Sequence, residues 1–155
     1  MLPPILTENA MEKFAAQDPD FEAKVRASFA RQGLMTNLGA KMVQVTPGEV
    51  VLELPYRDDI TQQQSFVHGA AVAAIVDTAC GYSALSLLPA GFDVVTVEYK
   101  VNFVAPAVGE KMIARGRVTK AGRTLTVCSG DCYAVRDGRE KLIATLQATM
   151  MAVQS

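Results

Sequence analysis

The sequence contains one histidine and three cysteines, which leaves few ligands for a metal centre or a disulfide framework. Cys80, Cys128 and Cys132 form no C-x-x-C pair and show no metal-binding spacing with His68. Structural zinc sites and disulfide-stapled folds both depend on such clustered ligands. We therefore expect neither a metal nor a structural disulfide, and the cysteine usage favours a reducing cytoplasm.

A strong charge of either sign is also missing. The formal net charge is -1, from 15 Lys and Arg against 16 Asp and Glu, and there is no long basic run. This balance disfavours nucleic acid as the main partner, although a small anionic ligand remains compatible with it. The N-terminus, MLPPILTENAMEKF, lacks the basic region of a signal peptide and soon becomes charged, so we expect a cytoplasmic protein.

One long apolar run is present, and it contains a single charge. From Gly69 to Leu88 the chain reads GAAVAAIVDTACGYSALSLL, in which Asp77 is the only charged residue. A membrane span needs about 20 apolar residues, but aspartate at mid-span costs about 2.5 to 3.5 kcal/mol, so we expect a buried helix instead. A buried carboxylate needs a hydrogen-bonding partner, a raised pKa or a functional use.

Half of the 155 residues are apolar, enough for one compact domain with a short appendage. We divide the chain into an N-terminal helical segment, 1–36, and a main domain, 37–155. In the first part, Asp18 is expected to cap a helix whose first residue is the following proline, and the helix continues to Gly33. A shorter helical piece is expected at 9–17.

Strand-like segments make up most of the main domain. Two of them are separated by a Pro-Gly turn and followed by a polar loop that contains TQQQ, and four more come after the apolar helix. The expected strands are 38–46, 50–56, 93–104, 110–120, 124–136 and 141–153. Turns of a few residues separate the late strands, which is too short for parallel crossovers. We expect an α+β fold in which an antiparallel sheet wraps around the central helix.

His68 and Asp77 cannot cooperate within one helix. Nine residues turn a helix by about 900° and advance it by roughly 13 Å, which places the two side chains half a turn out of phase. If both serve one site, a second subunit must bring its own 62–69 loop beside this Asp77. The sequence therefore predicts a homodimer with two equivalent shared sites.

Three stretches of the chain carry a family resemblance: SFVHGAAVAAIVDTACG, VVTVEYKVNFVAPAVGE and GRVTKAGRTLTVCSGDCYAVRDGREKLIATLQATM. Together they resemble the hotdog-fold acyl-CoA thioesterases of the PaaI-like branch, over about 37–151. The resemblance implies an acyl-CoA substrate, hydrolysis to a free acid and CoA without a metal or redox cofactor, and a homodimer or a dimer of dimers.

The resemblance also implies roles for individual residues. Asp77 matches the aspartate that acts as general base on water, or as nucleophile, although it could instead only hold buried polar groups. Gly69 matches the glycine whose amide, at a helix N-terminus, receives the developing oxyanion, although it could instead only allow close approach of loop and helix. The family often has two glycines here, whereas this chain has Gly69-Ala70. His68 matches the histidine that contacts the substrate or braces the loop, and Thr96 matches a Ser/Thr that positions water or is an ordinary strand residue. Gln62 matches a polar residue that holds water or the thioester oxygen, with Gln63 and Gln64 as alternatives.

For the phosphates of coenzyme A, the chain offers Arg115, Arg117, Lys120 and Arg123, because arginine forks suit phosphate oxygens. Arg123 is the first choice, since AGR at this turn resembles the family pattern; a solvated sheet edge is the alternative explanation. Tyr82 and Phe66 could line an acyl pocket or simply pack in the core.

Two other functions are compatible with this fold. Hotdog domains also serve as non-catalytic acyl-CoA or fatty-acid sensors, but a pure binder gains little from a buried base. A hotdog hydratase fits less well, because His68 precedes Asp77 in this chain, and this order does not resemble the Asp-before-His arrangement of those enzymes. The acyl group and the choice between dimer and tetramer stay open.

Overall fold

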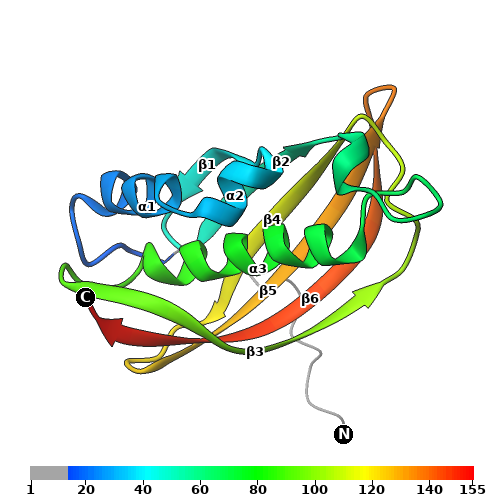
Figure 1. The fold of residues 1–155 in the computed structure, drawn as a ribbon. Coiled ribbons are helices and arrows are strands. Elements are labelled where there is room, and N and C mark those ends of the chain that lie inside the picture. The colour runs from blue at the N-terminus through cyan, green and yellow to red at the C-terminus, as the bar shows by residue number, and fades with distance from the viewer. Residues whose placement is uncertain (1–13) are drawn as a thin grey trace, which may run out of the picture.

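A six-stranded antiparallel sheet curves around one long helix in the structure, a computed structural model that describes residues 14–155 (Figure 1). Two shorter helices lie beside the long helix at the N-terminal end of the described chain. In chain order the elements are α1 (Phe21–Ala30), α2 (Gly33–Leu38), β1 (Lys41–Thr46), β2 (Glu49–Pro55), η1 (Asp58–Ile60), α3 (Gly69–Leu85), β3 (Phe92–Phe103), β4 (Lys111–Lys120), β5 (Leu125–Arg136) and β6 (Arg139–Gln154).

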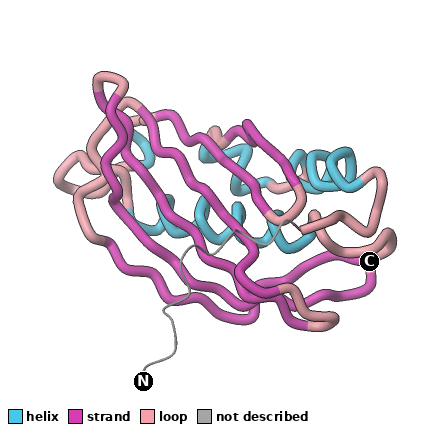
Figure 2. Tube along the Cα trace, turned by 180° about the vertical axis from the view of Figure 1, so that it is seen from behind, coloured by secondary structure: helices cyan, strands magenta, loops and turns pink. Residues whose placement is uncertain are grey.

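The strand order in the sheet is β1-β2-β4-β5-β6-β3, with every neighbouring pair antiparallel. Strand β3 follows α3 in the chain, yet it pairs with β6, the last strand, and so lies at one edge of the sheet. Figure 2 shows the sheet from behind, with the helices on its far side. The expected antiparallel sheet around a central helix is confirmed.

Helix α3 is buried around most of its circumference. Eleven of its seventeen residues are buried, and Ile75, Val76 and Ala79 are fully inaccessible to solvent. A helix that is apolar on all sides must be covered on several of them. The curved sheet covers most of α3, and α1 contacts α3 as well.

Two glycines allow the sheet to approach α3 closely. A Cβ atom at Gly116 would clash with the backbone of Ala79 and Cys80, and a Cβ atom at Gly130 would lie 2.6 Å from Cγ1 of Val76. Any side chain at these two positions of β4 and β5 would therefore push the helix away from the sheet.

The predicted start of the first helix is wrong by two residues. The cap is Asp20 and the helix begins at Phe21, because Asp18 folds the preceding segment into a turn instead. Oδ1 of Asp18 accepts a hydrogen bond from the amide of Asp20 at 2.9 Å, and Oδ2 pairs with Lys24 Nζ at 3.2 Å. Short acidic side chains favour such turns over helix interiors.

The region after this helix also differs from the prediction. Gly33 does not end a helix but begins α2, and the strand expected from Leu38 begins only at Lys41. Gly39 separates the two with φ of 77°, the left-handed conformation that ends many helices. The helical piece expected at 9–17 falls partly outside the described residues, and Phe14–Gln17 are not helical.

The remaining strand boundaries agree with the sequence prediction to within two residues, and the polar loop contains the short 3-10 helix η1. The central helix begins at Gly69 as expected but ends at Leu85, three residues before the end of the apolar run. The three cysteines are free and buried. Within residues 14–155, no helix is long and apolar enough to cross a membrane.

Candidate active site

Asp77 and Thr96 meet across the gap between α3 and β3. Oγ1 of Thr96 donates a hydrogen bond to Oδ1 of Asp77 at 2.9 Å. Burial beside the sheet raises the pKa of the Asp77 carboxyl above its ordinary value, while the hydrogen bond from Thr96 acts in the opposite direction and lowers it. Asp77 is thus a half-buried carboxylate that accepts one hydrogen bond, from Thr96, and whose pKa is raised.

A cavity of about 330 Å³ opens beside this pair. Eight of its ten lining residues carry polar side chains, although α3 itself is apolar. Helix α1 contributes Ser28, and the residues between α1 and α2 contribute Arg31 and Gln32. Sequence reasoning missed these three residues because nothing in that segment shows which face meets α3. Tyr82, predicted as a pocket or core residue, is both buried and part of the lining, and its hydroxyl lies 3.1 Å from Ser28 Oγ.

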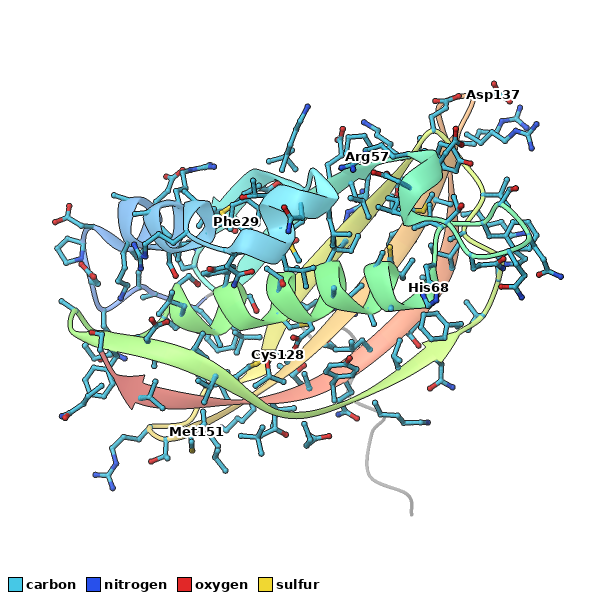
Figure 3. The ribbon with its side chains drawn as sticks, viewed as in Figure 1. Phe29, Arg57, His68, Cys128, Asp137 and Met151 are labelled. Carbon is cyan, nitrogen blue, oxygen red and sulfur yellow. The ribbon has the colours of Figure 1, made fainter. Side chains whose placement is uncertain are left out.

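The N-terminus of α3 is capped by His68, which Figure 3 labels at that end of the helix. Nδ1 of His68 accepts a hydrogen bond from the amide of Ala70 at 2.9 Å, so the neutral ring carries its proton on Nε2. The amides of Ala71 and Val72 donate to the His68 carbonyl. Among residues 14–155, no acceptor is placed for the amide of Gly69, which leaves a first-turn donor free.

A second, smaller cavity of about 160 Å³ contains Gly69 and Gln62. Apart from Gln62, its lining is apolar and includes Phe66 and Phe103. The Gln62 carboxamide binds within its own loop, where its oxygen accepts from the amide of Gln64 and its nitrogen donates to Gln64 Oε1 at 3.3 Å. Gln62 therefore supports the loop that borders Gly69.

The five predicted catalytic residues fall into separate groups within one chain. Asp77 and Thr96 line the first cavity, Gly69 and Gln62 line the second, and the exposed His68 side faces a third, with a volume of about 370 Å³. None of these three cavities contains both Asp77 and Gly69. Asp77 and Gly69, the residues predicted as base and oxyanion donor, thus lie at different cavities of one chain.

Of the four cations predicted to bind phosphate, two form ion pairs within the described chain and two do not. Arg115 forms two hydrogen bonds of 2.8 Å with Glu140 and lies 4.8 Å over the Tyr133 ring. Arg117 pairs with Asp131 at 2.9 Å. Lys120 and Arg123 flank the turn between β4 and β5 and form no ion pair with any residue of 14–155.

The cysteines are poor nucleophiles in this structure. Burial raises the pKa of Cys128 to about 11 and that of Cys132 to about 12, and it raises the pKa of Cys80 as well. Such thiols stay protonated near neutrality. Within residues 14–155, no three His, Cys, Asp or Glu side chains are grouped closely enough to hold a metal ion.

Comparison with known proteins identifies the family and the fold of this chain. The family model described as "Thioesterase superfamily" matches residues 64–141. A thioesterase family protein from Silicibacter pomeroyi is 49% identical with a TM-score of 0.86, and the match covers 87% of this chain and 99% of that one. The PaaI protein from the phenylacetic acid degradation operon of E. coli is 16% identical and shows the same fold, with a TM-score of 0.79 over 90% of this chain and 98% of its own.

Two curated relatives have intermediate sequence identity. Human acyl-coenzyme A thioesterase 13 is 31% identical over 104 residues, which are 66% of this chain and 72% of the human protein. A relative from Saccharolobus solfataricus is 31% identical over 90 residues, 58% of this chain, and the match spans 64% of its length, less than two thirds. The family-model match, which contains both His68 and Asp77, and the shared sheet-around-helix architecture lead to one conclusion: the chain belongs to the thioesterase superfamily and has the hotdog fold of its PaaI-like members.

Proposed function

We propose that this protein hydrolyses acyl-CoA thioesters to a free carboxylic acid and CoA. The observation that carries the proposal is the half-buried Asp77 carboxylate, hydrogen-bonded by Thr96 at the edge of a polar cavity. A carboxylate with a raised pKa is a stronger base than an ordinary one, provided that it stays ionised near neutrality. The superfamily membership and the thioesterase names of relatives support the same reaction.

The reaction proceeds by attack of water on the thioester carbonyl. Asp77 removes a proton as the water oxygen bonds to the carbonyl carbon, and Thr96 keeps the carboxylate oriented. The amide of Gly69 donates to the oxyanion that forms, since the helix N-terminus favours negative charge. When the C–S bond breaks, the sulfur of CoA takes the proton back from Asp77. His68 and Gln62 act as positioning residues, because His68 accepts the amide of Ala70 and Gln62 accepts the amide of Gln64 in the loop before the helix.

We propose that the two halves of the site come from two copies of the chain, paired through β3. The six consecutive residues 95–100 of this edge strand are exposed, and Val97 and Phe103 are each more than half exposed. An exposed apolar edge strand is a template for pairing with another strand, and the simplest partner is the same strand of a second copy.

The position of β3 also supports a shared site. An antiparallel pair about the middle of β3 would place the Phe103 end of one copy beside the Phe92 end of the other. Phe103 packs against Gly69, as a Cβ atom there would lie 3.1 Å from the ring. The Phe92 end leads into the cavity of Asp77, which Val94 and Thr96 line. Pairing therefore carries Gly69 of one copy towards Asp77 of the other.

Val97→Asp tests this interface. Because residue 97 lies near the middle of β3, the two introduced carboxylates would repel each other across the two-fold axis. We expect light scattering after size exclusion to show the monomer mass, and kcat/KM to fall with the dimer fraction. Val43→Asp, at a residue of 51% exposure on the opposite edge strand against 52% for Val97, is the matched control and should leave mass and activity unchanged. A dimeric, fully active Val97→Asp protein would exclude pairing through β3.

Release of CoA thiol from a panel of aliphatic and arylacetyl-CoA substrates tests the reaction itself. Turnover of at least one member of the panel at steady state is the expected result. Tight binding of intact thioesters with no thiol release would instead indicate a sensor.

The pH dependence of kcat/KM tests the pairing of Asp77 with Thr96. Since the carboxyl pKa is raised by burial, the rate should increase with pH through a value above 3.8 and then level off. Thr96→Val removes the hydrogen bond that lowers this pKa, so the acid limb should move to higher pH. Thr96→Ser, which keeps the hydroxyl, should leave the limb in place. An unchanged limb in Thr96→Val would show that another group controls it.

A further inference from the structure

A basic cavity of about 640 Å³ lies next to the cavity that contains Gly69. It is formed by the loop after β3, the end of β5 and the start of β6, and Pro106 lines both cavities, which makes them neighbours. Figure 3 shows His68, just before Gly69, and Asp137, in the turn between β5 and β6, at the same end of the molecule. This end is therefore common to the oxyanion donor and the basic cavity.

The register of the sheet explains why the cavity lies there. Strand β6 pairs Ala144 with Phe103, whose ring packs on Gly69. The residues before Ala144 continue past the end of β3 and pair with β5, where Lys141 is opposite Ala134. The first residues of β6 thus extend from the Gly69 cavity towards the turn at Asp137.

Three cations line this cavity: Arg136, Arg139 and Lys141. All three are exposed, and neither Arg139 nor Lys141 forms an ion pair with any residue of 14–155. Arg139 and Lys141 are two residues apart on β6 and so project to the same side. Free cations on one side of a cavity wall suit an anionic ligand.

The two acids in the lining do not cancel this charge. Glu140 projects to the opposite side of β6 and is held by the guanidinium of Arg115 through two hydrogen bonds of 2.8 Å, so its charge already has a partner. Asp137 lies 3.9 Å from the guanidinium of Arg136, and both side chains are mostly exposed, which makes that contact weak.

We propose that this basic cavity binds the phosphates of the CoA moiety, with Arg139 and Lys141 as the principal contacts. The inference rests on the proposed function and deepens it. The small apolar cavity at Gly69 then receives the uncharged pantetheine arm, which leads past Pro106 to the phosphates. The acyl group extends the other way, into the cavity of the partner's Asp77.

The location differs from the one suggested by the sequence. Arg115 already pairs with Glu140, and Arg117 already pairs with Asp131. Arg123 lies at the other end of the sheet, because it precedes Leu125, which pairs with Met151 near the end of β6. The basic cavity is instead at the start of β6, near Phe103. Arg115 keeps a role here, because it holds Glu140 away from the ligand side.

Calorimetric titration of the intact protein with CoA, 3′-dephospho-CoA and pantetheine tests the proposal without any turnover. We expect the wild type to bind CoA at least about tenfold more tightly than pantetheine, as charge-assisted contacts to phosphate are strong. Arg139→Ala/Lys141→Ala should weaken CoA binding about tenfold and leave pantetheine binding unchanged. Arg26→Ala/Lys41→Ala, which removes two cations from α1 and β1, should bind CoA like the wild type.

Two results would overturn the proposal. One is equal affinity of the Arg139→Ala/Lys141→Ala protein and the wild type for CoA. The other is a loss of CoA affinity in Lys120→Ala/Arg123→Ala alone, which would return the phosphates to the turn between β4 and β5. Because binding is measured without hydrolysis, a protein that binds CoA through Arg139 and Lys141 but releases no thiol would contradict only the proposed reaction.

Discussion

Asp77→Asn should reduce kcat by about 10²- to 10⁴-fold, the range expected when a general base is lost. Asparagine has nearly the same shape and can still accept the hydrogen bond from Thr96, so the cavity keeps its form while the basic oxygen disappears. Thiol release from the best acyl-CoA of the panel is the measurement, with KM changing little. A variant within tenfold of the wild type would remove Asp77 from the reaction.

The stability of Asp77→Asn provides an independent check that the fold survives. Since folding raises the pKa of this carboxyl, the folded state favours the protonated form, and its contribution to stability is lost as pH rises through the folded pKa. At neutral pH the neutral asparagine should therefore be at least as stable as the wild type in thermal unfolding. Asp20→Asn, which keeps a capping residue at α1, is the matched substitution and should retain full activity.

Gly69→Pro should lower kcat by about 10²- to 10³-fold relative to Gly69→Ala, because it deletes the amide proposed to receive the oxyanion. Proline is tolerated at the first residue of a helix, and His68, with φ of -61° and ψ of 137°, already has the conformation that precedes proline. Both variants place a Cβ atom against the exposed Phe103 ring. Alanine keeps the backbone N–H at residue 69, whereas proline lacks it, so the comparison between the two variants reports on that N–H group. Equal kcat values for the two variants would show that another donor holds the oxyanion.

Mixed dimers can show whether the base and the donor come from different subunits. An Asp77→Asn chain paired with a Gly69→Pro chain leaves one doubly defective site and one intact site if the sites are shared. Such a heterodimer, purified with two different tags, should recover about half of the wild-type activity per dimer. If each chain uses its own Asp77 and Gly69, no activity returns.

The sequence could predict the central helix and the carboxylate on it because their signals are local. The apolar run that begins at Gly69 predicts the helix and its start, and the single charge in that run predicts the partly buried carboxylate of Asp77. The alternation of the late strands also predicted the sheet, and the boundaries hold because each strand has one buried face.

What the sequence could not predict depends on contacts between distant segments. The strand expected from Leu38 begins only at Lys41, because Leu38 ends α2 and Gly39 caps that helix in the left-handed conformation. The partners of Arg115 and Arg117 are set by the register of β4, β5 and β6, which no local pattern reveals. The same is true of Ser28 and Arg31, which reach the Asp77 cavity only because α1 folds back over α3.

The close approach of the sheet to α3 gives Gly116 and Gly130 an influence on chemistry that neither residue touches. They lie beneath Ala79 and Val76, on either side of Asp77 in the helix, so their missing side chains set how deep the carboxylate sits relative to Thr96. A methyl group at either position should push α3 away from the sheet and lengthen the Asp77–Thr96 hydrogen bond. Because that hydrogen bond lowers the pKa of Asp77, the basicity of the carboxylate should change. If the proposed reaction is correct, substitutions in β4 and β5 should therefore alter the pH response of this protein, although neither Gly116 nor Gly130 lines the cavity of Asp77.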